Sequence, residues 1–203
     1  MTFKFNENKL TDSNLIFEFE DTVPMWVVKS GEEQFKKFGF EYGHHGSTED
    51  DGKPYFGKML FLKDANHDIA KPHIALNILD LIRFKLLDDI DPNGIFIDID
   101  RIAVNGQLPG QSPEKHIDSS DKENLWTAIY YASDSDGDTL FFQSLKNPQT
   151  QIYKADYKQG KIVIFPGCFL HQAMAPSTNW RISIGISFLW DTYLNKSIRY
   201  DTK

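Results

Sequence analysis

The spacing of apolar residues changes along the chain and separates one helical segment from a long series of strands. Between residues 72 and 90, apolar side chains recur every three or four positions, which predicts one amphipathic helix. Pro72 suits the first position of that helix, and the turn-forming residues 91–94 predict its end. A single long helix among strands is expected to brace the outer face of a sheet.

Short apolar stretches follow this helix, and turn residues separate them. Turns are predicted at Gly106 and at Pro109-Gly110, for example. Many short strands of this kind are typical of antiparallel sandwiches and jelly rolls. The pattern therefore predicts a mainly β fold with a bracing helix, arranged as an antiparallel sandwich or a jelly roll. The predicted strands are 96–104, 125–132, 139–142, 151–157, 161–165 and 180–190.

The segment before the helix has a weaker pattern. Residues 4–29 contain short alternating runs, including 25–28, which predict edge strands or extended segments. Residues 32–38 predict one or two helical turns. Residues 43–58 are rich in Gly, Asp and His without apolar periodicity, which predicts a mobile loop that could close over a site. A short strand is expected at 59–62.

Length and composition narrow the class of protein. The 203 residues predict one domain, with its motif-bearing part at about 95–190. The net charge of -7 disfavours nucleic acid as a partner, because phosphate contacts need clustered Lys and Arg. The single cysteine, Cys168, fits a reducing compartment, and no apolar run reaches membrane-spanning length. We therefore expect a soluble cytoplasmic protein without a membrane partner, with a frayed polar tail at 192–203.

His116 and Asp118 are the first candidate ligands of a metal. Side chains two positions apart on an extended segment point to the same face, so this pair would present an imidazole and a carboxylate to one point. With a histidine from a distant strand, such a set holds Fe(II) on one side and leaves the opposite coordination positions open. The alternative is a charged pair on a surface strand, because a His-x-Asp motif is short enough to occur by accident.

His171 and Arg181 extend this candidate site. His171 follows the apolar strand predicted at 161–165, where a histidine either packs in the core or provides the third metal ligand. Arg181 lies in another apolar strand with Ser183 on the same face, and a guanidinium buried there needs a partner. A dicarboxylate ligand would supply that partner through a two-pronged charge-assisted bond. The alternative is a salt bridge to one of the chain's Asp or Glu residues.

In this combination and order, the motifs resemble those of the Fe(II)- and 2-oxoglutarate-dependent dioxygenases, in their prolyl 4-hydroxylase-like branch, over residues 100–190. Residues 125–131 (Leu-Trp-Thr-Ala-Ile-Tyr-Tyr) resemble the family's Ile-Tyr-Tyr strand, and residues 136–139 (Asp-Gly-Asp-Thr) resemble its Gly-Gly-Glu-Thr turn. The site residues that the resemblance implies are His116, Asp118 and His171 as iron ligands, Arg181 and Tyr131 for the far carboxylate of 2-oxoglutarate, Ser183 as an assisting residue, and Asn105 or Gln107 in place of a tyrosine that many relatives carry on the preceding strand.

The resemblance implies that the fold is a double-stranded β-helix (a cupin-like jelly roll), and it also implies a reaction. A C–H bond of the substrate would be hydroxylated while O2 and 2-oxoglutarate are consumed and succinate and CO2 are released, with ascorbate as a potential reductant. The branch suggests a prolyl residue in a peptide or protein as substrate, although relatives also act on small molecules. Two alternatives stay open: a jelly-roll binding or structural module in which the His and Asp residues are coincidental, and a cupin-like metalloprotein that uses the same three ligands without 2-oxoglutarate.

Overall fold

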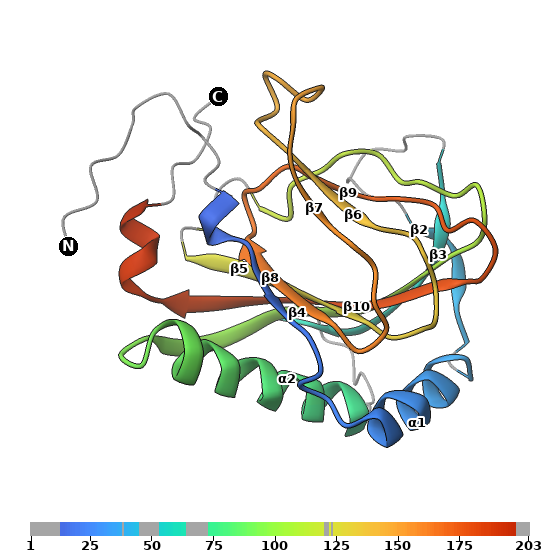
Figure 1. Ribbon diagram of the computed structural model, residues 1–203, viewed down its shortest axis with the longest axis horizontal. Coiled ribbons are helices and arrows are strands. Elements are labelled where there is room, and N and C mark those ends of the chain that lie inside the picture. The colour runs from blue at the N-terminus through green and yellow to red at the C-terminus, as the bar shows by residue number, and fades with distance from the viewer. Residues whose placement is uncertain are drawn as a thin grey trace.

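The computed structural model describes residues 13–37, 39–44, 53–63, 73–119, 122 and 124–197. Two antiparallel β-sheets face each other, and two helices, α1 and α2, lie under the outer face of the larger sheet (Figure 1). This is a jelly roll, one of the two arrangements that the strand pattern predicts and the one that the family resemblance implies. Two short 3₁₀-helices, Ser13–Leu15 and Tyr193–Ser197, lie near the ends of the described chain. Within the described residues, no helix is both long and apolar enough to cross a membrane.

Among the described residues, the larger sheet has seven strands in the order β1-β8-β5-β10-β4-β3-β2, and the smaller sheet has three in the order β7-β6-β9. Each strand predicted after the helix is present, with its bounds shifted by a few residues at most. The larger sheet consists of β1 (Phe17–Phe19), β2 (Glu41–His44), β3 (Tyr55–Leu62), β4 (Ile95–Gln107), β5 (Leu125–Tyr131), β8 (Ile162–Pro166) and β10 (Arg181–Asp191). The smaller sheet consists of β6 (Thr139–Phe142), β7 (Gln151–Ala155) and β9 (His171–Ala173).

The predicted bracing helix is confirmed. Helix α2 (His73–Lys85) continues directly into a π-helix, Leu86–Ile90. Together they cover the predicted segment except for Pro72, which lies outside the described residues. The apolar stripe that predicted the helix is the face that packs into the core. Its buried residues are Ala75, Ile78, Leu79, Ile82 and Leu86.

The prediction of an extended segment at 25–28 is wrong, because these residues begin α1 (Met25–Phe35). The buried positions of this helix are Val28, Glu32 and Phe35, together with Gly31. Their spacing of three and four is helical, but a window of four apolar residues is too short to reveal a period. The helix also takes in the first of the helical turns expected after residue 31.

The predicted mobile loop at 43–58 is strand at both of its ends. β2 includes its first residues, and β3 begins at Tyr55 and pairs with β4. The cause is not local, since residues 56–58 pair with residues 104–106 of β4, about fifty positions away, and no turn pattern reveals that pairing. Residues 45–52 lie outside the described residues, so a closing motion there stays a prediction.

Two further expectations are corrected. Gly106 is not a turn but lies inside β4, where a side chain would approach Trp180 and Phe40 to 3.3 Å. The beginning of the tail expected to be frayed is anchored, because Asn195 accepts a hydrogen bond from Trp126 Nε1 (3.0 Å) and donates one to the Trp190 carbonyl (2.7 Å). Residues 198–203 lie outside the described residues.

β10 shows how alternation sorts side chains between the two faces of the larger sheet. Its even-numbered residues from 182 to 190 are apolar and belong to the buried core that also contains the apolar stripe of α2. Its odd-numbered residues from 181 to 185 line a cavity between the sheets, as do residues 101–107 of β4 at odd positions and residues 127 and 129 of β5. Rows of side chains from three adjacent strands therefore meet in one space.

Candidate metal centre and anion site

A cavity of about 120 Å³ lies between the two sheets. Its walls come from β3, β4, β5 and β10 of the larger sheet, from β6 and β9 of the smaller sheet, and from the segment 113–118. Most of the residues that the sequence predicts for a functional site are brought together here. The polar lining includes His116, Asp118, His171, Arg101, Arg181, Asn105, Gln107, Thr127, Thr139 and Ser183.

His116, Asp118 and His171 form a compact group in this cavity. Each offers one ligand atom, and the three atoms lie within 4.8 Å of one another. Two backbone hydrogen bonds join the histidines: His116 N–H donates to the His171 carbonyl (3.0 Å), and His171 N–H donates to the His116 carbonyl (2.9 Å). The Asp118 N–H donates to the carbonyl of Gly167, just after β8 (2.8 Å). The backbone thus holds all three residues around one point.

The tautomer of each histidine follows from its hydrogen-bond partner. His116 Nδ1 lies 3.0 Å from the Glu114 carbonyl, and His171 Nδ1 lies 2.9 Å from the Phe169 carbonyl. A carbonyl oxygen can only accept, so Nδ1 of each ring carries the proton and donates it. The lone pair is then on Nε2 in both rings, which is the arrangement that a carbonyl partner imposes on metal-binding histidines.

The electrostatics of the group suit a cation. Burial, together with the neighbouring His116 ring, lowers the pKa of His171 to about 4, so His171 is neutral at pH 7. Burial by itself would raise the pKa of Asp118, but His171, Arg101, His116 and a hydrogen bond from Thr127 outweigh it and lower this pKa to about 2. Near neutral pH the cavity presents an ionised carboxylate and a neutral imidazole, the protonation states that metal ligands require.

Two residues that the sequence analysis did not predict hold the Asp118 carboxylate. Arg101 Nη2 donates to Oδ1 (2.9 Å), and Thr127 Oγ1 donates to Oδ2 (2.5 Å). Oδ2 is also the atom that faces His171 Nε2, at 4.0 Å. Arg101 and Thr127 lie on β4 and β5, on either side of β10, and both pair with Ser187. The signal for Arg101 was present, since it is an arginine within an apolar strand, just as Arg181 is.

Arg181 is the second charged feature of the cavity. Its side chain is buried, and the residue is only 2% exposed. Nη1 donates to Gln107 Oε1 (2.9 Å) and to Ser183 Oγ (3.1 Å), and Nε donates to the Gly137 carbonyl (2.7 Å). Among the described residues, no carboxylate lies within 4.0 Å of the guanidinium. The salt bridge considered from the sequence is therefore absent from the described part of the chain, and a buried positive charge is left with neutral partners.

Tyr131 lies beside Arg181 but is not part of the cavity lining. Its ring stacks on Tyr157 (centroids 4.2 Å apart), and the Arg181 guanidinium carbon lies 5.5 Å from the centroid of each ring. The Tyr131 hydroxyl donates to Thr139 Oγ1 (2.8 Å), which also accepts from Arg181 Nη2 (3.1 Å). Burial raises the pKa of the Tyr131 hydroxyl, so it stays a donor. Thr139, which the sequence analysis placed in a turn but did not predict as a site residue, lines the cavity together with Arg181, whereas the two tyrosines do not.

The remaining predicted residues occupy the same wall. Ser183 and Gln107 accept hydrogen bonds from Arg181, and Gln107 Nε2 donates to the Gln111 carbonyl (2.8 Å), which fixes the orientation of its amide. Asn105 lies opposite Ser183 in the β4–β10 register and lines the cavity. The structure therefore brings Ser183, Gln107 and Asn105 to the arginine, and their roles toward a ligand stay predictions.

The residues fit a divalent metal and a small dicarboxylate. Two imidazole Nε2 atoms and one carboxylate form the two-histidine, one-carboxylate set that suits Fe(II). The Arg181 guanidinium, which contacts no carboxylate in the described part of the chain, fits a carboxylate ligand. Two neighbouring positions of β6 mark these two groups. Thr139 accepts a hydrogen bond from Arg181, and Phe141 pairs with His171. The Cα atoms of Thr139 and Phe141 are separated by about 7 Å, the rise of two residues along a strand.

No protein-family model matches the sequence, and no curated protein matches it. Solved structures with the same fold include a prolyl-4-hydroxylase from Pseudomonas putida (TM-score 0.59, 14% identity, 86% of this chain and 92% of that chain). Another is a 2OG-Fe(II) oxygenase-family protein from Burkholderia pseudomallei (TM-score 0.62, 12% identity, 92% and 93%). A third is a prolyl hydroxylase from Trichoplax adhaerens in complex with a hypoxia inducible factor peptide (TM-score 0.62, 11% identity, 87% and 84%). The chain has the fold of these oxygenases, and at such identities the likeness is one of fold.

Proposed function

We propose that this protein is an Fe(II)- and 2-oxoglutarate-dependent dioxygenase that hydroxylates a C–H bond. One observation supports this most strongly: a two-histidine, one-carboxylate group shares one cavity of about 120 Å³ with a buried arginine that has no carboxylate partner among the described residues. Neither feature alone is specific for this chemistry. Together they match a metal chelated by a keto acid whose far carboxylate needs a cation.

His116, Asp118 and His171 would hold the metal from one side. When bound, Fe(II) with 2-oxoglutarate and O2 supplies the oxidative chemistry, in which 2-oxoglutarate becomes succinate and CO2 and a substrate C–H bond becomes C–OH. The Glu114 and Phe169 carbonyls keep both Nε2 lone pairs directed into the cavity. Thr127 and Arg101 keep the carboxylate from rotating out of position.

Arg181 would bind the far carboxylate of 2-oxoglutarate. Its Nη1 and Nη2 groups already donate to Gln107, Ser183 and Thr139, so the plane of the guanidinium is fixed before a ligand enters. Thr139 would add a hydroxyl next to the same carboxylate, while Tyr131 acts from behind by donating to Thr139. Ile129, Ala103 and other apolar residues complete the wall, which keeps the pair dry and strengthens it.

The class of substrate is a further part of the proposal. The fold relatives include prolyl hydroxylases, one of them in complex with a peptide, which makes a prolyl residue of a peptide or protein one candidate and a small molecule the other. The alternative functions are weaker. A binding or structural module has no need of the triad, and a cupin-like metalloprotein that does not use 2-oxoglutarate has no need of a buried Arg181.

An anaerobic absorption measurement tests the cofactor assignment without a substrate. The full chain is mixed with Fe(II) and then with 2-oxoglutarate in the absence of oxygen. We expect the weak visible charge-transfer band of the keto-acid chelate to form in the wild type and in Asp80→Asn, an exposed aspartate on α2 that serves as control. Asp118→Asn should not form it. Metal binding without the band would support the cupin-like alternative, and no metal binding would support the inert module.

Turnover provides the second test. With O2, 2-oxoglutarate and ascorbate as reductant, uncoupled succinate release should fall at least about 100-fold in His171→Ala, since removing a ligand costs more than removing an outer-shell partner of one. Wild-type rates of succinate release in that variant would contradict the metal assignment.

A further inference from the structure

Arg101 places a second guanidinium in the cavity, at the metal group rather than at Arg181. It lies on the inner side of β4, and its side chain is 38% exposed. A guanidinium has five N–H donors. In the described part of the chain, Arg101 uses one of them, the bond from Nη2 to Asp118 Oδ1. Its other donors have no partner among the described residues, and Arg101 lines the cavity.

Orienting Asp118 does not by itself explain an arginine at this position. The Thr127 hydroxyl also holds this carboxylate, and it does so without a charge. A positive charge on the outer oxygen of a metal ligand weakens the attraction of that carboxylate for a cation and repels the cation directly. Arg101 therefore opposes metal binding unless another anion compensates its charge.

The need for such an anion can be seen by adding the charges of the described cavity residues to those of Fe(II) and 2-oxoglutarate. Asp118 is the one acidic residue among the described residues that line the cavity, and Arg101 and Arg181 are its arginines. Fe(II) would add two positive charges, and 2-oxoglutarate would add two negative ones. One positive charge is then left over. Because the far carboxylate of 2-oxoglutarate would pair with Arg181, this excess lies at Arg101, beside the Asp118 carboxylate.

We propose that Arg101 binds a carboxylate of the substrate, so that the oxygenase acts on a molecule with a free carboxylate close to the C–H bond that is hydroxylated. This inference rests on the proposed function and names the substrate class of the same site. A single negative charge matches the single excess charge, which favours a carboxylate over a phosphate dianion. The substrate is then a small carboxylic acid or the C-terminal residue of a chain, and an internal prolyl residue lacks the required group.

Binding of a minimal carboxylate tests the inference without turnover. The full chain is saturated with Zn(II), which cannot support oxidation, and with 2-oxoglutarate, and is then titrated with acetate or with the neutral acetamide. The Arg101 Nε–H resonance is followed by NMR, assigned through its own side-chain bonds. We expect a saturable shift with acetate at a concentration at least tenfold below any shift with acetamide. Arg83, an exposed arginine on α2, serves as the internal control and should not shift in this range. Equal responses to acetate and acetamide, or equal shifts of both arginines, would overturn the inference.

Turnover then distinguishes the two sources of the carboxylate. Succinate release is measured with free amino acids and with one peptide library prepared with free and with amidated C-termini. Stimulation by free amino acids identifies a small acid, and stimulation by free-acid peptides identifies a chain terminus. Either preference should disappear in Arg101→Gln and persist in part in Arg101→Lys. Equal stimulation by the amidated peptides would refute the inference. If acetate binds at Arg101 but no 2-oxoglutarate is consumed under any condition, the proposed function fails and the anion subsite remains.

Discussion

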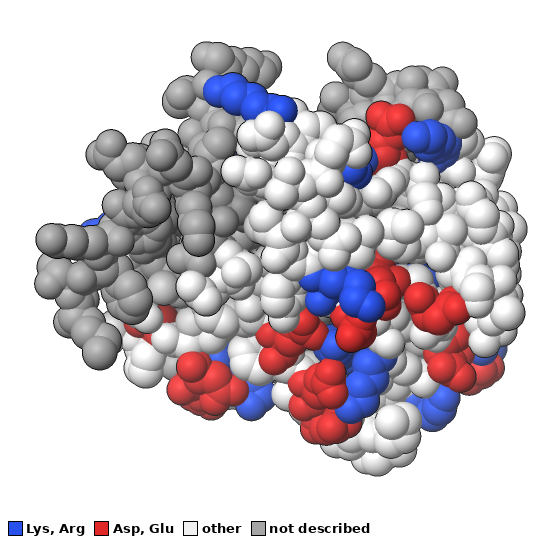
Figure 2. All heavy atoms as spheres, turned by 45° about the horizontal axis from the view of Figure 1, so that its top comes forward, with Lys and Arg blue, Asp and Glu red and all other residues white. Residues whose placement is uncertain are grey.

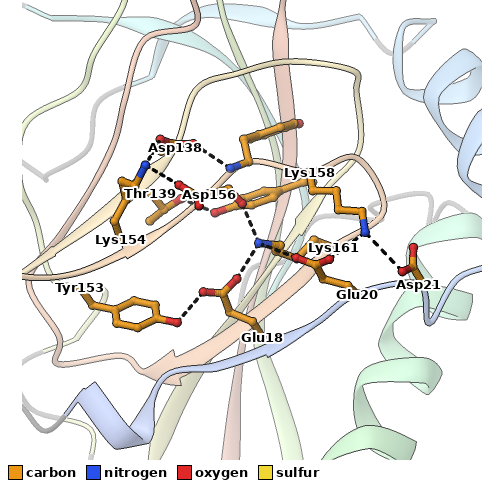
Figure 3. Close-up of polar contacts among 12 residues, drawn as sticks. Glu18, Glu20, Asp21, Asp138, Thr139, Tyr153, Lys154, Asp156, Lys158 and Lys161 are labelled. Atoms are coloured by element: carbon orange, nitrogen blue, oxygen red, sulfur yellow. Dashed lines mark hydrogen bonds and ion pairs between the residues drawn. The ribbon is translucent and has the colours of Figure 1, made fainter.

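The molecule buries two cations, Arg181 and Lys161, in different ways. Lys161 is 4% exposed, and its Nζ lies 2.6 Å from Glu18 Oε2 and 3.0 Å from Glu20 Oε1, with the Asp156 carbonyl at 2.8 Å (Figure 3). Arg181 is buried to a similar degree, but its described partners are hydroxyls, an amide oxygen and a backbone carbonyl. Among the described residues, the first cation therefore has carboxylate partners and the second has none, which is the basis for proposing that Arg181 binds a ligand.

The surroundings of the two residues agree with this difference. The Lys161 cluster joins β1 to distant segments: Tyr153 donates to Glu18 (2.6 Å), which raises the Tyr153 pKa to about 12, and Lys158 lies 2.7 Å from Glu20. Figure 3 shows these side chains converging from separate strands and loops. On the face drawn in Figure 2, acidic and basic side chains likewise lie intermixed. Ion pairing that links elements is structural, whereas an unpaired buried charge in a cavity indicates a binding site.

The largest expected effect is the loss of stability when the Lys161 cluster is disrupted. Lys161→Met should lower the free energy of unfolding by about 3 kcal/mol, because removing one partner of a buried pair leaves the other charges uncompensated. Urea unfolding of the metal-free protein measures this. Lys154→Met is the matched control: Lys154 pairs with Asp138 and Asp156 at the exposed surface, so its loss should cost less than about 1 kcal/mol. Equal losses in the two variants would remove the distinction between the cluster and ordinary surface pairs.

Ligand stabilisation sharpens the comparison. At a concentration of 100 times its dissociation constant, 2-oxoglutarate should stabilise the Zn(II)-loaded wild type by about 2.7 kcal/mol. The same increment is expected in Lys161→Met, even though that variant starts from a lower stability. In Arg181→Gln the increment at the same concentration should fall below about 1 kcal/mol. A reversed pattern, with the increment lost in Lys161→Met, would show that we have assigned the two cations the wrong way round.

The next prediction concerns the affinity of the protein for 2-oxoglutarate. Arg181→Gln should weaken 2-oxoglutarate binding about 30-fold, since charge-assisted hydrogen bonds contribute about 2 kcal/mol. Isothermal titration with Zn(II)-loaded protein measures it, and the affinity for Zn(II) should stay within about threefold because Arg181 contacts no residue of the triad. Arg83→Gln, an exposed arginine on α2, is the control. Unchanged 2-oxoglutarate affinity in Arg181→Gln would contradict the role of Arg181.

The sequence was sufficient to predict which residues share one face of a strand, because strand side chains alternate between the two faces. His116 and Asp118 are two residues apart, and Arg181 with Ser183 follows the same rule, so their shared faces could be predicted. Strands bounded by Gly, Asp and Pro were predicted for the same reason: the signal is local. Sequence similarity to known motifs then joined His171 to the group, which no local rule could do.

The parts that could not be predicted depend on contacts between distant segments. Lys161 and Glu18 are far apart in the chain, and neither is unusual in its own neighbourhood. Arg101 and Thr127 each stand alone in a strand, and only the pairing of both strands with β10 brings them to Asp118. The fold class could thus be predicted from the sequence. The contacts of Arg101 and Thr127 with Asp118 could not, because they depend on how β4 and β5 pair with β10.

The smallest expected effect concerns pH and the structural cluster. Hydrogen bonds from Lys158 and Lys161 lower the pKa of Glu20, so the stability that Glu20 contributes is present above its unfolded pKa of 4.5 and is lost as the pH falls through the lower folded value. Burial would lower the pKa of Lys161, but its bonds to Glu18 and Glu20 outweigh burial and raise it. The Lys161 contribution is therefore complete below 10.5 and is lost as the pH rises through the higher folded value. Unfolding temperatures between pH 3 and 11 should fall at both ends, and Lys161→Met should fall less steeply at both. Because the proposed 2-oxoglutarate site shares no residue with this cluster, saturating 2-oxoglutarate should not change the difference between the two proteins at any pH at which it binds, and a ligand-dependent difference would mean that the two cations are coupled.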